Sequence, residues 1–165
     1  MSDEWHAIAR AAGLLIDTNL LVLFVVGSIN RSRVPVFKRT SKYSGEDYDL
    51  LLRVIGAWRK PLFTLPHVLA EVSNLTDLKG HELLSARHFL KGTIAILREP
   101  ELASARAAQN AQYGDLGLVD AAIATLAREH DCAVLTDDLT LYLALHQEGV
   151  PSLNFAHLQA SNWGL

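Results

Sequence analysis

The sequence predicts an α/β fold with a short, mainly parallel central sheet of about four strands, flanked by six or seven helices. Short apolar runs alternate with longer segments of helical periodicity, which is the pattern of strand and helix units around a parallel sheet. The chain has 165 residues, half of them hydrophobic and a fifth charged, values typical of one globular domain. We therefore expect a single domain over residues 1–165.

The first half of the chain contains two expected strands. Residues 14–16 form a buried strand, followed by an apolar helix over about 18–27. Residues 28–43 are polar and basic, which indicates a loop or mobile arm. Residues 47–58 carry apolar side chains at a spacing of three and four, which predicts a helix, and 62–65 form the second strand.

The second half contains most of the expected helices. Pro66 suits the first turn of a helix, and Gly80 separates that helix from the next, which Pro100 ends. Alanine-rich segments predict two further helices, and Gly149 ends the last one. The expected elements are helices over 66–75, 80–98, 101–113, 118–129 and 139–147, and strands over 133–135 and 152–155.

Acidic residues fall where the expected strands end. The carboxyl ends of parallel strands share one edge of the sheet. Asp17 follows the first strand, and Asp137 and Asp138 follow the third. Glu71 and Asp120 lie in expected helices among apolar neighbours, where an acid is costly to bury unless it is paired or binds a cation.

Four or five carboxylates around one pocket repel each other unless a divalent cation neutralises them. A donor set of oxygen atoms alone favours Mg²⁺ or Mn²⁺ over Zn²⁺. Each acid also has a simpler explanation. Asp17, Asp137 and Asp138 could be helix N-caps, and Asp120 an ordinary first-turn acid; Glu71, inside a helix, is the hardest to explain in this way.

Four short motifs occur in order: Leu-Ile-Asp-Thr-Asn at 15–19, Val-Leu-Ala-Glu-Val at 68–72, Val-Asp-Ala-Ala-Ile at 119–123 and Leu-Thr-Asp-Asp at 135–138. Together they resemble the PIN-domain family of metal-dependent ribonucleases. In size and layout the chain is similar to the VapC-type toxins of toxin-antitoxin modules. The resemblance implies a PIN-like three-layer domain, an RNA substrate, a possible antitoxin partner and a possible homodimer.

The resemblance also implies roles for individual residues. Asp17, Glu71, Asp120 and one of the two final aspartates would hold one or two Mg²⁺ or Mn²⁺ ions. The family spacing Thr-x-Asp matches Thr136 and Asp138, which favours Asp138 over Asp137 as the fourth metal ligand, and the four favoured carboxylates would be the catalytic residues. Asn19 and Thr136 would support the site. The implied reaction is endonucleolytic cleavage of RNA that leaves a 5′-phosphate.

The basic segment offers a second candidate surface. Basic residues interleaved with aromatic ones suit a flexible RNA strand, although a solvated loop is an equal alternative. The formal net charge of −3 excludes a broad basic face. The candidate RNA-binding residues are Arg31, Arg33, Lys38, Arg39 and Lys42, with Phe37 and Tyr43 among them.

Two other functions fit parts of the sequence. A haloacid-dehalogenase-like phosphatase has an acid after its first strand, but it needs a second aspartate two residues later, and this chain has Asn19 there. A non-catalytic, RNA-binding PIN domain is the other, although the complete acidic set favours an enzyme.

The apolar N-terminal region, residues 7–29, does not have the pattern of a membrane segment. Its uninterrupted apolar run covers only 20–26, far short of a bilayer span. The single cysteine, Cys132, fits a reducing compartment. We therefore expect a cytoplasmic protein that does not bind membranes, in which the helix over 18–27 is buried in the core or at a dimer or partner interface.

Overall fold

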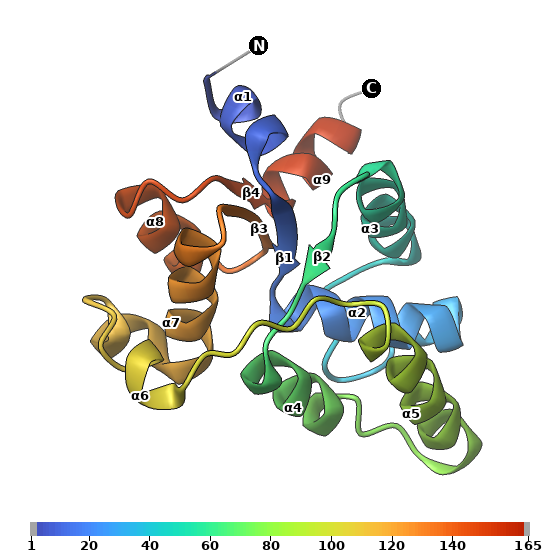
Figure 1. The fold of residues 1–165 in the computed structure, drawn as a ribbon. Helices are drawn as coiled ribbons and strands as arrows, with labels where there is room; N and C mark the ends of the chain where they lie inside the picture. The colour runs from blue at the N-terminus through green and yellow to red at the C-terminus, as the bar shows by residue number, and fades with distance from the viewer. Residues whose placement is uncertain (1–2, 164–165) are drawn as a thin grey trace.

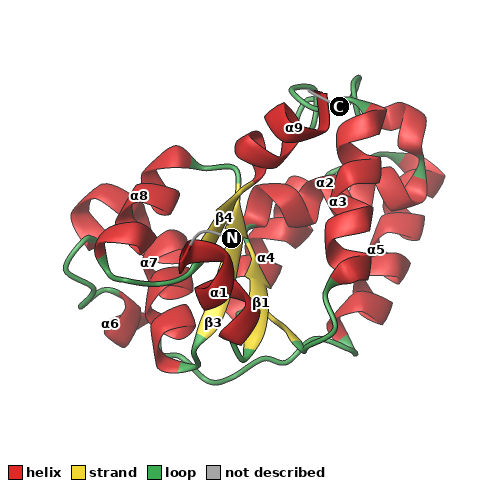
Figure 2. Ribbon diagram, turned by 90° about the horizontal axis from the view of Figure 1, so that it is seen from above, coloured by secondary structure: helices red, strands yellow, loops and turns green. Residues whose placement is uncertain are grey.

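A computed structural model describes the backbone of residues 3–163 and the side chains of residues 6–161. Its centre is a four-stranded parallel sheet in the order β2-β1-β3-β4. Helices α2, α3 and α5 lie on one side of this sheet and α6, α7 and α8 on the other (Figures 1 and 2). The strands are β1 (Gly13–Ile16), β2 (Leu62–Phe63), β3 (Cys132–Thr136) and β4 (Ser152–Asn154). The predicted fold class is confirmed.

The two central strands are buried at every position. A parallel strand covered by helices on both faces consists of continuous apolar residues, and β1 and β3 have this composition. Their register pairs Gly13 with Cys132 and Ile16 with Leu135. This register brings the residues that follow the two strands, from Asp17 and from Asp137, to the same edge of the sheet.

Strand β2 is shorter than the expected 62–65. The backbone N–H of Thr64 donates to the carbonyl of Arg98 rather than to β1, and the N–H of Arg98 donates to Leu62. The chain then enters helix α4 at Pro66. The segment around Arg98 therefore lies beside the edge strand in an extended form. The helix expected over 80–98 ends earlier for this reason, at Ile94.

The described residues form nine α-helices, more than the six or seven expected. Two of them, at the ends of the chain, lie in segments for which no helix is predicted, and the residues expected over 101–113 divide between a one-turn helix and the start of the next. The helices are α1 (Asp3–Arg10), α2 (Thr18–Ile29), α3 (Gly45–Ala57), α4 (Pro66–Leu75), α5 (Gly80–Ile94), α6 (Ser104–Ala107), α7 (Tyr113–Glu129), α8 (Leu139–Gln147) and α9 (Phe155–Trp163).

Helix α7 is interrupted at Gly117, whose φ of 73° and ψ of −179° are not helical. A glycine adopts positive φ at little cost because it has no Cβ. The expected start of a helix at residue 118 therefore corresponds to this break, and Asp120 lies in the first turn after it.

Of the two alternatives for the basic segment 28–43, a loop or a mobile arm, the structure has the form of a loop. Ser28 and Ile29 belong to α2, and Arg31–Arg33 form a 3-10 helix. Val34 and Tyr43 are buried in the core. The segment is a loop that packs on the body because apolar side chains anchor it at both ends; residues 30–44 are called the basic loop below.

Helix α2 belongs to the core. Leu20, Leu23 and Val26 are fully buried, and the helix packs against α3, α4 and α5. No helix in the described part of the chain is long and apolar enough to span a membrane. The expected single domain over 1–165 extends beyond the described residues at both ends and stays a prediction.

Candidate metal centre

Asp17 connects the two central strands at the edge where they end. Its side chain is buried, and its Oδ1 accepts a hydrogen bond of 2.9 Å from the N–H of Leu20, which caps helix α2. Its Oδ2 accepts from the hydroxyl of Thr136 and, at 3.1 Å, from the N–H of Asp137. Both oxygens therefore have donors, and the position of the carboxylate is fixed from both strands.

Four of the predicted acids line a single cavity of about 110 Å³. Asp17 directly follows β1, Glu71 lies in α4 and Asp120 in α7, and Asp138 directly precedes α8. Thr18 and Asn19 complete the lining. The topology therefore brings four acids from four separate parts of the chain to one place.

Two more of these acids, besides Asp17, have internal hydrogen-bond partners. Glu71 Oε2 accepts a hydrogen bond of 3.0 Å from the Thr18 hydroxyl. Asp138 caps α8, because its Oδ1 accepts from the N–H of Leu141 at 3.0 Å. Thr136 supports both aspartates. Its hydroxyl donates to Asp17 and accepts a hydrogen bond of 2.9 Å from the N–H of Asp138.

Asp137 is adjacent to Asp138 in the chain but does not line the cavity. Its Oδ2 accepts from the hydroxyl of Tyr43 and pairs with the ammonium of Lys42 at 2.5 Å. Its Oδ1 accepts from Asn19 Nδ2 at 3.4 Å. The structure thus directs the two neighbouring aspartates to different partners, Asp138 to the cavity and Asp137 to the basic loop.

The cavity favours a cation electrostatically. Burial raises the pKa of Asp17 to about 7, and the charge of Asp137 adds to this effect. Burial also raises the pKa of Asp120 to about 6, with further contributions from Asp138 and Glu71. A raised pKa means that the environment disfavours the ionised form of a carboxyl group. A bound cation would stabilise that ionised form.

The donor set fits a hard divalent cation, since every side chain that lines the cavity offers oxygen, from carboxylate, hydroxyl or amide groups. However, no three His, Cys, Asp or Glu side chains of the described residues are arranged to hold a metal ion as they stand. Asp17 accepts hydrogen bonds at both carboxylate oxygens, and Glu71 and Asp138 each accept one at a single oxygen. Ligation would replace some of these donors with the cation.

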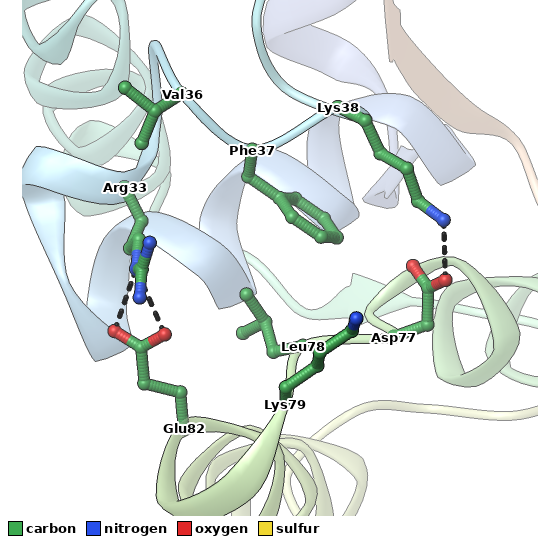
Figure 3. Close-up of a pocket in the computed structure, with 8 residues that line it drawn as sticks. All are labelled: Arg33, Val36, Phe37, Lys38, Asp77, Leu78, Lys79 and Glu82. Atoms are coloured by element: carbon green, nitrogen blue, oxygen red, sulfur yellow. Dashed lines mark hydrogen bonds and ion pairs between the residues drawn. The ribbon is translucent and has the colours of Figure 1, made fainter.

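The bases of the basic loop are mostly paired within the protein. Arg33 pairs with Glu82 at 2.9 Å and Lys38 with Asp77 at 2.7 Å, around a second pocket (Figure 3). Arg31 pairs with Asp49 at 2.8 Å and with Glu46 at 3.4 Å, and Lys42 pairs with Asp137. Arg39 has no ion pair among the side chains that the structure describes.

Two residues near the cavity are not among the site residues that the sequence predicts. Thr18 stands between Asp17 and Asn19, and its hydroxyl binds Glu71. Tyr43, an aromatic residue of the basic loop, is buried and donates its hydroxyl to Asp137. No local signal identifies the contact of Tyr43, because the two residues are 94 positions apart.

Comparison with known families agrees with this architecture. The PIN-domain family matches residues 14–144, which include β1 except its first residue, all of β2 and β3, and all four cavity acids. The chain belongs to the PIN-domain family. Members of this family are typically metal-dependent nucleases. No significant match was found among curated proteins. Strand β4 and helix α9 of this PIN domain lie beyond the matched range.

Proposed function

We propose that this PIN domain is a metal-dependent endoribonuclease, which hydrolyses phosphodiester bonds of RNA and leaves a 5′-phosphate. One observation carries the proposal: Asp17, Glu71, Asp120 and Asp138, from four separate parts of the chain, line one small cavity. Membership of a family of nucleases supports it. Family membership also favours a nuclease over a haloacid-dehalogenase-like phosphatase.

The cavity acids would hold one or two Mg²⁺ or Mn²⁺ ions. When bound, such an ion supplies Lewis-acid chemistry: it makes a water molecule more acidic and neutralises charge on the phosphate oxygens. Asp17 and Asp138 are the ligands whose positions are already fixed, because Thr136 bonds to both. Asp137 is the weaker candidate, since its carboxylate binds the basic loop.

The remaining residues would orient the reactants. A carboxylate that is not fully used as a ligand would accept the proton of the attacking water. Glu71 suits this role, because the Thr18 hydroxyl is the one hydrogen-bond donor that it has among the described residues, which leaves one oxygen to accept a proton. Asn19 lines the cavity and holds Asp137 with its amide, so it keeps that carboxylate in place beside the site.

Two biological roles are compatible with the proposed ribonuclease activity. The size of the chain and its PIN family support a toxin of a toxin-antitoxin pair, which would have an antitoxin partner and could form a homodimer. An RNA-processing nuclease is the alternative, and a small adjacent reading frame for an antitoxin would distinguish the two. The single free cysteine, Cys132, is compatible with a cytoplasmic location.

The test is incubation of the protein with a mixed RNA pool in Mg²⁺, in Mn²⁺ or in a chelator. We expect cleavage with either metal and none with chelator. Asp17→Asn and Asp120→Asn should lower the cleavage rate at least 100-fold, roughly the loss of about 3 kcal/mol of transition-state stabilisation. Both should keep the wild-type circular dichroism spectrum.

Asp49→Asn is the matched control, because Asp49 binds Arg31 on the surface, outside the cavity lining. It should cleave at the wild-type rate. Cleavage that survives the chelator, or an Asp17→Asn variant with full activity, would contradict the metal-dependent mechanism. Absence of cleavage with both metals would leave the non-catalytic, RNA-binding PIN domain as the better description.

A further inference from the structure

The cavity presents RNA with an electrostatic problem. Four carboxylates line it, and none of its described lining residues is basic. A phosphate that approaches this edge of the sheet also meets the carboxylate of Asp137. Bound divalent ions would offset part of this charge. A nucleotide chain continues past the reacting phosphate, and a basic side chain at the rim of the cavity would favour binding of its next phosphate.

Lys42 places such a cation there. Its Nζ lies 2.5 Å from Asp137 Oδ2, and the other oxygen of the same carboxylate binds Asn19, which lines the cavity. The Lys42 ammonium is therefore separated from the cavity lining by one carboxylate group. Its side chain is 56% exposed, whereas that of Asp137 is 8% exposed, so the ammonium lies on the solvent side of the pair.

Tyr43 anchors this part of the loop, so Lys42 is not needed for that purpose. Tyr43 is 4% exposed, donates its hydroxyl to Asp137 and packs edge-on against Phe155 at 6.4 Å between ring centroids. If Lys42 leaves, Asp137 keeps the hydroxyl of Tyr43 and the amide of Asn19. Lys42 is the exposed member of the pair, so its ammonium can turn toward a phosphate in solvent while Tyr43 and Asp137 stay in place.

The other paired bases of the loop are held elsewhere. Arg31 binds acids of α3, Arg33 binds an acid of α5, and Lys38 binds Asp77 between α4 and α5. None of these partner acids lines the carboxylate cavity. Lys42 is thus the loop base whose partner belongs to the Thr136, Asp137, Asp138 segment that follows β3.

We propose that Lys42 is a substrate-binding residue, which exchanges Asp137 for an oxygen of an RNA phosphate next to the one that is cleaved. This inference rests on the proposed ribonuclease function. The basic loop would then take part in the site through one residue at its end, and Asp137 would serve to hold the ammonium in place before RNA arrives.

Binding without cleavage tests the exchange directly. A single-stranded oligoribonucleotide is titrated in chelator by fluorescence anisotropy at several salt concentrations. Lys42→Met should weaken binding about tenfold, the effect of losing one charge-assisted hydrogen bond. The slope of log K against log salt should become shallower by about 0.7, the value for one phosphate contact on a single strand. Lys42→Arg should keep the wild-type slope.

Arg128→Met is the matched control. Arg128 pairs with Glu148 at 3.1 Å, with side chains 54% and 12% exposed, so this pair resembles that of Lys42 and Asp137 in exposure. It should bind RNA with the wild-type slope. In Mg²⁺, Lys42→Met should raise KM about tenfold and leave kcat within about threefold, because the contact holds a phosphate that does not react.

The outcomes separate this inference from the proposed function. A wild-type protein that neither binds nor cleaves RNA overturns both. A wild-type protein that cleaves RNA, with a Lys42→Met variant whose salt slope equals that of Arg128→Met, overturns the role of Lys42 alone. If Lys42 had only a structural role, Lys42→Met would lower the melting temperature or kcat but leave the salt slope of RNA binding unchanged. That result would also overturn the proposed role of Lys42 in substrate binding.

Discussion

Asp17 caps a helix and also lines the candidate metal cavity, two features that the sequence presents as alternatives. One of its oxygens caps α2 through the N–H of Leu20, and the other accepts from Thr136 and Asp137. Asp138 similarly caps α8 and lines the cavity. An acid at the end of a parallel strand is followed at once by a helix, so the same residue can cap that helix and face the site. The cap is therefore no argument against a functional role.

The raised pKa of Asp17 predicts how stability depends on pH without metal. Its folded-state pKa is about 7 and its ordinary value is 3.8. The folded protein holds this proton more tightly than the unfolded chain, so the stabilising contribution is full below about pH 4 and is lost as the pH rises through about 7. The size of the effect is about 4 kcal/mol.

The measurement is the free energy of unfolding in urea, with chelator, for wild type and Asp17→Asn between pH 4 and pH 8. Acids with lowered pKa values, such as Asp49 and Glu82, change stability in the opposite direction in both proteins, so the difference between the two isolates Asp17. We expect wild type to lose stability relative to the variant as the pH rises. A constant difference would contradict the raised pKa.

At the scale of elements, close packing between α2 and α3 holds the start and the end of the basic loop together. Gly27 on α2 faces the ring of Tyr48 on α3, and a Cβ at residue 27 would lie 2.2 Å from that ring. Helix α3 begins at Gly45, earlier than the expected residue 47, because Ser44 and Asp47 form a capping box. The sequence contains this signal, Ser followed three residues later by an acid.

Gly27→Ala should therefore destabilise the fold by about 1 to 3 kcal/mol, the usual cost of overpacking a core. This is the reverse of the normal effect of alanine in a helix, which is stabilising by up to about 1 kcal/mol. Gly92→Ala on α5 is the control, because its Cβ would meet nothing within 4 Å. Thermal unfolding should show a lower melting temperature for the first variant and an equal or higher one for the second.

At the scale of the whole molecule, the formal net charge of −3 is the sum of an acidic cavity and a remainder that is close to neutral. Without the four cavity acids, 14 of the 18 acidic residues remain against 15 basic ones. The acidic balance therefore comes from the cavity. The bases do not form a broad positive face either, since four of the five in the basic loop pair with acids of this chain.

Divalent metal should stabilise the whole protein, because an ion that binds only the folded state adds to its stability by mass action. At a metal concentration about 100 times Kd the gain is about 2.7 kcal/mol, or roughly 5 to 11 °C in melting temperature for a domain of this size. Differential scanning calorimetry with Mg²⁺ or Mn²⁺ at pH 7.5 measures it.

Asp120→Asn should lose most of this increase, whereas Asp77→Asn should keep it, because Asp77 binds Lys38 outside the cavity lining. An equal increase in both variants would mean that the metal binds elsewhere. Since this experiment needs no RNA, it tests the metal centre independently of the proposed activity.

The sequence by itself determined the features that depend on neighbours in the chain. Continuous apolar runs identify β1 and β3 because both faces of a central strand are covered. The acids that follow these strands indicate the edge where a site can form. Gly117 marks the break in α7, because a positive φ favours glycine. These signals act over a few residues, so they are visible in one dimension.

Only the tertiary structure decided which distant groups meet. It placed Asp138 at the cavity and Asp137 against Lys42 and Tyr43, residues about 95 positions earlier in the chain. It also packed the basic loop onto the body, where the sequence allows a mobile arm. Ion pairs and hydrogen bonds depend on distances of a few ångströms between side chains, and those distances are set by the whole fold and not by any local pattern.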